Sequence, residues 1–352
     1  MPKSTNRNTV FWLALFVVII ALVYALRSIL LPFALGCMIG YLFDPVVDKL
    51  EKHHINRTLA ACLVLLAIIL ISVPALAIIS YFAESQIRSF ILALPRYISS
   101  LSEKIAPLIS SLQENFPDLN KESALEYLQN NFSQALKILG KVLQKIITGS
   151  YALFNIISLL LITPVVAFYM LRDWNSFIRH ADELLPKAYK KEIREQAKAI
   201  DKIISSFIRG QVSVCVILGT FYALGLSIVG LDLGLMVGFI AGLISFIPYV
   251  GSITGFILSL GIAVAQFDSL TPIIAVTGVF VVGQFLEGNF LTPKLVGDSI
   301  GLHPVWVMFA LLSGGVLLGF LGMMIAVPLA AVIGVLLRYA TTKYKQSYLY
   351  KG

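Results

Sequence analysis

The chain has 352 residues, of which 58% are hydrophobic and 13% are charged, and its formal net charge is +8. Soluble proteins are about 45–50% apolar and about 25% charged. With so few charges to cover its apolar surface, the chain is not an ordinary soluble protein, and we expect an all-α polytopic membrane protein. Nucleic-acid binding is also excluded, because the basic residues lie in short loops beside apolar runs, a pattern typical of membrane topology.

Residues 1–83 contain three apolar runs that predict transmembrane helices. The run 10–26 follows two basic residues but precedes no cleavage motif, so it predicts a retained first helix. A second helix is expected to end at Asp44, and a third to cover 58–83. The loop 44–57 between them is basic and is therefore expected in the cytoplasm.

Residues 84–147 change in character, because charges return and apolar residues recur at steps of three and four. This period predicts an extracytoplasmic insert of amphipathic helices that pack on each other or between subunits. A fourth transmembrane helix is expected over 148–171 and a basic amphipathic helix over 172–209. The basic excess of that helix and of the tail 339–352 places both, and both chain termini, in the cytoplasm.

Residues 210–338 predict the transport core, which has two broken helical hairpins. Residues 233–267 divide at 247–251 into two pieces, each too short to cross a bilayer that needs about 20 residues. Small residues allow close helix packing on both sides of this break. They are Gly230, Gly234, Gly238 and Gly242 before the break, and Gly251, Gly255 and Ser259 after it. Residues 304–337 are also apolar and are broken near their middle.

A span followed by a broken hairpin thus occurs twice in the transport core, which predicts the inverted repeat of many secondary transporters. The whole chain would then have about eight membrane segments, including the two broken or re-entrant hairpins. Two ordinary short spans per hairpin are the alternative. The first hairpin tip, with Pro248, Tyr249 and Gly251, is expected to act as a gate, or else as a passive turn.

Glu287 is the leading candidate for a transport residue, with Gln284 one helical turn earlier on the same face. A carboxylate at membrane depth is costly unless it is paired or faces water. We therefore expect Glu287 to carry a proton or a cation, in a path that also includes Gln284, Asn289, Lys294 and Asp298. The alternative is that Glu287 caps a helix end or pairs with Lys294.

Several further residues mark expected helix breaks and motifs, namely Asp44, Gln211, Pro293, His303 and Pro304. No catalytic constellation, metal-ligand spacing or nucleotide-binding loop is found in the sequence. The three cysteines lie far apart in apolar runs. We therefore expect no enzyme, no metal and no cofactor, and transport driven by an ion gradient or by facilitated flux.

Four segments together resemble the autoinducer-2 exporter (AI-2E) family. They are Pro32-Phe33 with Tyr41-Leu42-Phe43-Asp44-Pro45, Arg209-Gly210-Gln211, Ile247-Pro248-Tyr249-Val250-Gly251, and the stretch from Glu287 to Pro304. The resemblance spans nearly the whole chain. It implies a multi-pass transporter of the bacterial inner membrane and a homo-oligomer, for which a pentamer is one candidate state.

The family resemblance implies two kinds of cargo. An autoinducer-2-like furanone would need hydrogen-bonding groups such as Gln284, Asn289 and Tyr249, whereas sodium(lithium)/proton antiport would need Glu287 or Asp298. We predict a secondary or facilitated exporter of a small solute that works by alternating access, with the hairpins as opposite gates. Cation/proton antiport is the first alternative. An oligomeric scaffold or channel, which needs no shared face of Gln284 and Glu287, is the second.

Overall fold

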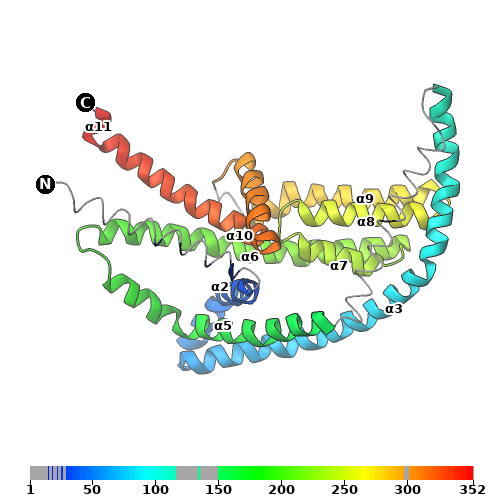
Figure 1. The fold of residues 1–352 in the computed structure, drawn as a ribbon. Coiled ribbons are helices and arrows are strands. Elements are labelled where there is room, and N and C mark those ends of the chain that lie inside the picture. The colour runs from blue at the N-terminus through cyan, green and yellow to red at the C-terminus, as the bar shows by residue number, and fades with distance from the viewer. Residues whose placement is uncertain are drawn as a thin grey trace. The chain divides into compact units, whose positions relative to one another are not determined.

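The computed structural model describes residues 29–115, 150–296 and 301–351, together with residues 15, 18, 22, 25, 26 and 134. Within these residues every regular element is a helix (Figure 1). The helices are α2 (Leu30–Lys52), α3 (Arg57–Asn115), α5 (Ser150–Glu183), α6 (Lys190–Val229), α7 (Gly234–Ile244), α8 (Val250–Gln266), α9 (Leu270–Leu286), the π-helix η1 (Glu287–Val296), α10 (Pro304–Gln346) and α11 (Tyr348–Lys351).

Five stretches of the described chain are long and apolar enough to cross a membrane. They are α2, the Arg57–Ala93 part of α3, α6, α9 together with η1, and α10. The predicted all-α membrane architecture is therefore confirmed. The count of eight segments and the re-entrance of the hairpins stay predictions, and the predicted first helix over 10–26 lies mostly outside the described residues.

The chain divides into two compact units. One unit consists of Met1–Ala67, Ile156–Arg209 and Val296–Gly352, and the other of Ile68–Asn155 and Gly210–Leu295. The α7–α8 hairpin lies in the second unit and α10 in the first. The predicted transport core 210–338 thus contributes to both.

The second predicted helix does not end at Asp44, because α2 continues through Pro45 to Lys52. Three carboxylates on one side of α2 bind the guanidinium of Arg57, whose Nε also donates to the Leu171 carbonyl at 2.8 Å. These acceptors are Asp44 at 2.6 Å, Asp48 at 2.8 Å and Glu51 at 3.0 Å. They hold the last turns of α2 in place despite the proline, so the expected loop 44–57 shortens to 53–56.

Two predicted boundaries outside the transport core also differ in the structure. Helix α3 passes without a break from the expected third span into the expected insert, of which residues 116–149 lie outside the described part except for Gln134. The predicted helix 172–209 is two helices, because α5 ends at Glu183 before Pro186 and α6 begins at Lys190. Proline disfavours helical geometry in the residue before it, which accounts for this stop.

An ion-pair cluster bridges the short connection between α5 and α6. Asp182 accepts from Lys190 at 2.9 Å and from the guanidinium of Arg194. These hydrogen bonds hold the pKa of Asp182 well below its usual range. The cluster therefore keeps its charges paired at neutral pH.

Both hairpins of the C-terminal half break close to the predicted positions. Helix α7 ends at Ile244 and α8 begins at Val250, with Tyr249 in the left-handed region at φ 67°. Within α10 the helix is interrupted at Gly319, whose φ of 64° and ψ of −140° suit only glycine. We call Pro304–Leu318 and Phe320–Gln346 the first and second arms of α10.

Helices α6, α7, α8 and α9 form the tightly packed part of the second unit. The glycine face of α7 lies against α6, since a Cβ at Gly238 would come within 2.3 Å of the Ala223 nitrogen. In turn α8 lies against α7 through Gly251, where a Cβ would come within 2.2 Å of the Ser245 nitrogen. Helices α7, α8 and α9 lie side by side in Figure 1.

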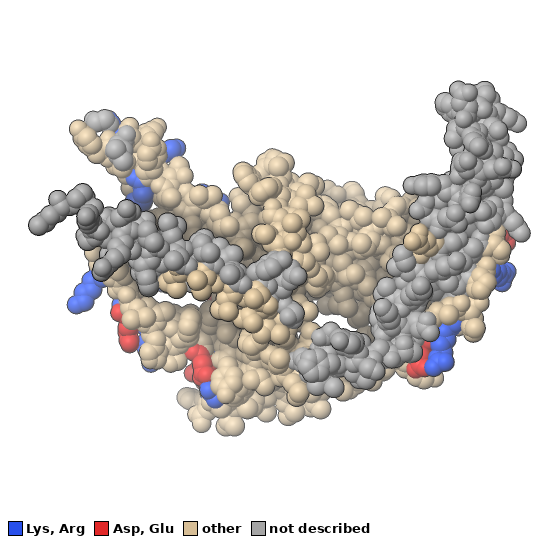
Figure 2. All heavy atoms as spheres, viewed as in Figure 1, with Lys and Arg blue, Asp and Glu red and all other residues tan. Residues whose placement is uncertain are grey.

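The outer faces of α8 and α9 are apolar. Large hydrophobic side chains are exposed there, among them Ile257 and Ile274. The face of these helices that is visible in Figure 2 carries no Lys, Arg, Asp or Glu. An exposed apolar surface of this kind is expected where a protein contacts lipid.

Candidate functional site

Glu287 stands at the junction of α9 and η1 and is buried, with 7% of its surface exposed. The Nε2 of Gln284 donates a hydrogen bond to its Oε2 at 2.7 Å. The two side chains thus share a face, as their spacing predicts. A π-helix is rare and often marks a functional site, so the winding that begins at Glu287 also singles out this position.

The carboxylate of Glu287 forms no ion pair with a described residue. The expected pairing with Lys294 is not found, because Lys294 is exposed and its Nζ lies 5.9 Å from the ring centroid of Phe290. A buried carboxylate without a cationic partner is costly in an apolar span unless it is protonated or holds a cation. Glu287 is therefore chemically suited to exchange one for the other.

A hydrogen-bonded path leads from Glu287 to the hairpin tip. The hydroxyl of Ser252, in the first turn of α8, lies 3.3 Å from the Oε1 of Gln284 and 3.3 Å from the carbonyl oxygen of Tyr249. The amide of Gln284 therefore stands between the carboxylate on one side and the hairpin on the other. Among the predicted tip residues, Tyr249 belongs to this path and Gly251 packs beside it.

The opposite end of the turn is attached to α6. The Nε2 of Gln211 donates to the carbonyl oxygen of Ser245 at 2.6 Å, and both residues are buried. Gln211 lies inside α6, which runs without a break from the expected amphipathic helix into the expected fifth span. Gln211 serves as a polar anchor that satisfies a carbonyl of the turn.

Tyr222 is a member of the site that sequence reasoning missed. Its ring is fully buried on α6 and stacks on Phe280 with a centroid distance of 4.7 Å. Its hydroxyl has no hydrogen-bond partner among the described residues. A Cβ at Gly283 would come within 2.6 Å of this hydroxyl, so the glycine makes room for it.

The signal for Tyr222 in the sequence is weak. A tyrosine inside an apolar span brings a polar group that needs a partner when buried. That requirement alone does not say which helix supplies the partner. The position of the unpartnered hydroxyl, against Gly283 of α9, is a tertiary feature.

A cavity of about 270 Å³ adjoins the polar path. It is lined by Ser252, Ile253, Phe256, Phe280, Val281 and Gln284. The two polar members are the same groups that connect Glu287 to the hairpin tip. The volume lies just below the usual range of about 300–1,000 Å³ for ligand pockets, so only a small molecule fits.

The structure does not bring all the predicted residues to this site. Asn289 is exposed and donates to the Phe285 carbonyl at 3.1 Å, and Pro293 lies inside η1. Asp298 falls outside the described residues. The remaining three belong to the other unit.

Of these three, Asp44 binds Arg57 inside α2, so it neither ends a helix nor stands at a break. His303 and Pro304 do mark a helix start. The Nδ1 of His303 accepts from the Val305 nitrogen at 3.3 Å at the N-terminus of α10. Pro304 is the first residue of that helix, a position that tolerates proline well.

Comparison with known proteins places the chain among transporters. The profile of the AI-2E family transporter matches residues 13–341. The chain is 28% identical over 320 residues to YueF of Bacillus subtilis (88% of this chain, 83% of YueF) and 29% identical over 318 residues to YrrI of the same organism (89% and 86%). It is 25% identical over 326 residues to the permease PerM of Escherichia coli (91% of each).

These relatives carry provisional names as transport proteins or permeases, and none of the names states a substrate. The family match covers nearly the whole described chain, including the Glu287 site and both hairpins. The resemblance of the sequence motifs is thereby confirmed. The chain belongs to the AI-2E transporter family, whose members are multi-pass membrane proteins of the transporter or permease class.

Proposed function

We propose that the chain is a secondary transporter in which Glu287 takes up and releases a proton, and in which this change moves the α7–α8 hairpin during export of a small polar solute. The observation that carries the proposal is the unbroken polar path from Glu287 through Gln284 and Ser252 to the hairpin tip. Buried ionisable groups in membrane proteins commonly mark ion pathways.

Protonation of Glu287 would change the hydrogen bonds at the hairpin, because it changes which groups donate and which accept. A carboxylate only accepts, so it holds the NH₂ group of Gln284 toward itself and leaves the amide oxygen for Ser252. A protonated carboxyl can donate, which favours the opposite orientation of the amide. Ser252 would then lose its acceptor on Gln284 and donate to the Tyr249 carbonyl alone.

The cavity beside Gln284 and Ser252 supports a small cargo. Its volume of about 270 Å³ suits a compact molecule whose polar atoms can meet Ser252 and Gln284, and an autoinducer-2-like furanone is the candidate given by family membership. The aromatic rings of Phe256 and Phe280 supply its apolar walls. No nucleotide-binding loop is present in the sequence, so an ion gradient is the expected energy source.

Sodium(lithium)/proton antiport is the second candidate, and one observation favours it. Glu287 is buried without a cationic partner among the described residues, so a monovalent cation can replace its proton. In this case the furanone-sized cavity would hold water or stay unused. The same site residues would serve both candidate functions, and the two functions are distinguished by whether the cargo is a cation or a small organic solute.

Membrane vesicles test the proposal. Inside-out vesicles that contain the protein are energised to an acid interior and followed with a pH-sensitive dye, while sodium, lithium or the furanone is added. Glu287→Gln removes the titrating group at constant shape. Glu195→Gln, on the exposed side of α6, is the matched control.

A cargo-dependent proton efflux that is kept in Glu195→Gln and lost in Glu287→Gln is the expected result. Efflux with the cations alone would establish antiport, and efflux with the furanone would establish export. Efflux that survives in Glu287→Gln would refute Glu287 as the carrier. Function that persists after both Gln284 and Glu287 are replaced by Leu would favour the scaffold or channel alternative.

The proposal also includes a homo-oligomer in the bacterial inner membrane with both termini in the cytoplasm. The basic residues of the tail and of α6 support this orientation through the positive-inside rule. Cysteine labelling at Ser347 in intact cells and in inside-out vesicles checks it. Labelling in intact cells would indicate that the C-terminus lies outside the cytoplasm and would contradict the proposed orientation.

A further inference from the structure

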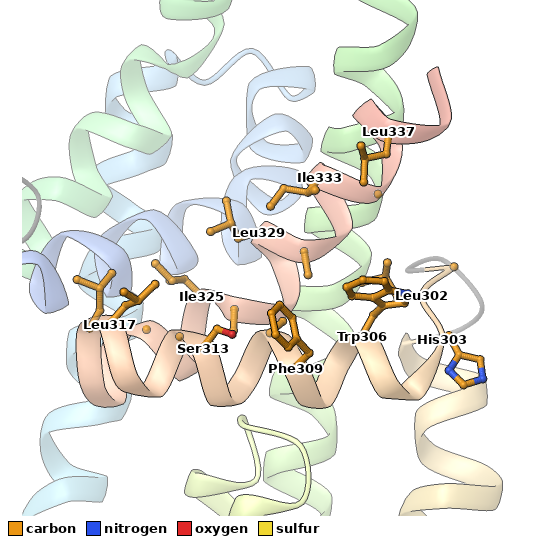
Figure 3. A pocket seen from close by; sticks show the side chains of 18 of the residues that line it. Leu302, His303, Trp306, Phe309, Ser313, Leu317, Ile325, Leu329, Ile333 and Leu337 are labelled. Atoms are coloured by element: carbon orange, nitrogen blue, oxygen red, sulfur yellow. The ribbon is translucent and has the colours of Figure 1, made fainter. Parts of the chain in front are cut away.

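A groove of about 560 Å³ lies between the two arms of α10 (Figure 3). The arms touch near the bend, where a Cβ at Gly322 would come within 1.9 Å of the Gly314 carbonyl oxygen. Trp306, Phe309 and Ser313 project from the first arm toward the second, as Figure 3 shows. The groove belongs to one unit and is separate from the Glu287 site.

The walls of the groove are apolar along its length. Large side chains that line it remain exposed, including Trp306 at 61%, Leu317 at 62% and Leu337 at 61%. Ser313 is the only polar side chain in the middle of the lining. A path for a polar solute would need more hydrogen-bonding groups, so the groove is suited to a hydrocarbon chain.

One end of the groove carries a positive charge. Arg338 is exposed there and forms no ion pair with any described residue, and its Nη1 donates to the Gly301 carbonyl at 3.4 Å. The indole N–H of Trp306, at the same end, has no acceptor within the described part of the chain. Two donors therefore stand at the mouth of the groove, beside His303, and apart from Ser313 the rest of the lining is apolar.

The volume of the groove, about 560 Å³, is that of a pocket for a single small or slender ligand. The groove lies within the range of about 300–1,000 Å³ that is usual for ligand pockets. Its single charged end also gives it the polarity of an amphiphile, which a second apolar helix would not match.

We infer that the α10 groove binds one anionic phospholipid, with an acyl chain along the two arms and the phosphate at Arg338. A guanidinium can bind two phosphate oxygens at once, and the indole N–H can reach a third acceptor of the headgroup. Basic residues near a membrane surface attract anionic lipids by about 1 kcal/mol each. With the tail in the cytoplasm, the groove opens to the cytoplasmic leaflet.

Native mass spectrometry of the detergent-purified full chain tests the inference. The probes are phosphatidylglycerol and phosphatidylcholine with identical acyl chains, titrated separately. Arg338→Gln removes the charge, and Ala330→Phe fills the groove. The matched controls are Lys345→Gln, which removes a nearby charge, and Ala340→Phe, which adds a ring on an exposed part of α10 outside the groove.

The wild type is expected to bind one phosphatidylglycerol per chain in preference to phosphatidylcholine. Arg338→Gln should weaken phosphatidylglycerol binding about fivefold and leave phosphatidylcholine unchanged. Ala330→Phe should abolish both, and the two controls should behave as the wild type. Monodisperse elution with unchanged helicity verifies that each variant is folded.

Two outcomes would overturn the inference. Equal retention of phosphatidylglycerol by Ala330→Phe and Ala340→Phe would place the lipid elsewhere. A lower subunit number in Ala330→Phe with an unchanged lipid count would assign the groove to a contact between copies of the chain. Neither readout depends on transport, so the result stands apart from the function proposed for Glu287.

Discussion

The two broken helices of the C-terminal half use the same kind of break and reach opposite results. The α7–α8 hairpin is closed, with Gly251 against Ser245 and Gly255 against Ala241. The arms of α10 meet at Gly314 and Gly322 and then part to leave a groove. Small residues near a break therefore do not by themselves produce a closed hairpin.

The difference arises from the residues that follow the contact. The second arm of α10 offers small residues to the groove, namely Gly322, Ala326, Ala330 and Gly334. The first arm presents the large rings of Trp306 and Phe309 to the groove. Close packing of helices requires small residues on both partners, and the arms of α10 meet that requirement at Gly314 and Gly322 but not beside these rings.

The polar content of the two hairpins differs as well. Buried Ser245 and Ser252 connect the α7–α8 turn to its neighbours, whereas the α10 bend has no comparable side-chain network among the described residues. Because the closed α7–α8 hairpin has these polar connections, it can respond to a change in the charge of Glu287. An open apolar one can hold hydrocarbon.

The largest expected effect comes from adding a methyl group to the glycine face of α7. A Cβ at Gly242 would lie 2.0 Å from the Cα of Gly219, a backbone atom that cannot move away cheaply. We expect Gly242→Ala to lower the free energy of unfolding by about 3 kcal/mol, measured by titration with a denaturing detergent. The control Gly278→Ala meets nothing within 4 Å and should be neutral or stabilising by up to about 1 kcal/mol. Equal loss in both variants would contradict the closed packing.

A smaller effect is expected at the single contact of α10. Gly322→Ala places its Cβ against the Gly314 carbonyl, but the arms can part at Gly319 and relieve the clash. We expect a loss of about 2 kcal/mol and a longer distance between spin labels at positions 312 and 336. Gly315→Ala meets only the flexible side chain of Met323 and should change neither. An unchanged distance in Gly322→Ala would mean that this contact does not set the angle of the arms.

The polar path provides the third test. Gln284→Leu removes the only hydrogen bond that the described residues provide to Glu287, and we expect a loss of about 1.5 kcal/mol in unfolding free energy. Thr277→Val, on the same helix, removes a hydroxyl that donates only to the Ile273 carbonyl one turn earlier, so it should cost less than about 0.5 kcal/mol. Similar losses in the two variants would argue against a special role of Gln284.

The base of the closed hairpin gives the smallest effect. The Tyr97 hydroxyl donates to Asp232 at the start of α7, and Tyr97→Phe should cost between about 0.5 and 1 kcal/mol. Burial, and then the hydrogen bond to Asp232, raise the pKa of Tyr97. This contribution is therefore present below pH of about 10, the unfolded pKa of tyrosine, and is lost as the pH rises through the raised folded value.

Spectrophotometric titration of tyrosinate checks this prediction. The amplitude of the late part of the titration should fall by one tyrosine in Tyr97→Phe relative to the wild type. The exposed Tyr348 serves as the control for stability, since Tyr348→Phe should leave the free energy of unfolding unchanged. A late amplitude that is unchanged in Tyr97→Phe would disprove the assignment.

Features local to one helix could be predicted from the sequence. Apolar runs predict the helices, the cluster of small residues near the middle of 304–337 predicts a break there, and the spacing of Gln284 and Glu287 predicts their shared face. The continuation of α2 past Pro45 could not be predicted. It depends on Arg57, which reaches back from the next helix to three carboxylates.

The remainder of the site is tertiary and lay beyond sequence reasoning. Ser252 meets Gln284 across 32 positions, and Gln211 meets Ser245 across 34. Helical periodicity defines which residues share a face of one helix, but not which face of a neighbour they meet. Tyr222 was missed for the same reason, because Phe280, on which its ring stacks, lies on another helix.

The π-helix that begins at Glu287 gives this residue an unusual backbone conformation. The rarity of π-helices shows that this winding is less favourable than an α-helix, so rewinding there is less costly than elsewhere in the span. A gain or loss of one residue per turn rotates the following side chains by about 100° about the helix axis. Glu287 thus lies at a point where the following part of the membrane helix can rotate about its axis without a shift along the axis.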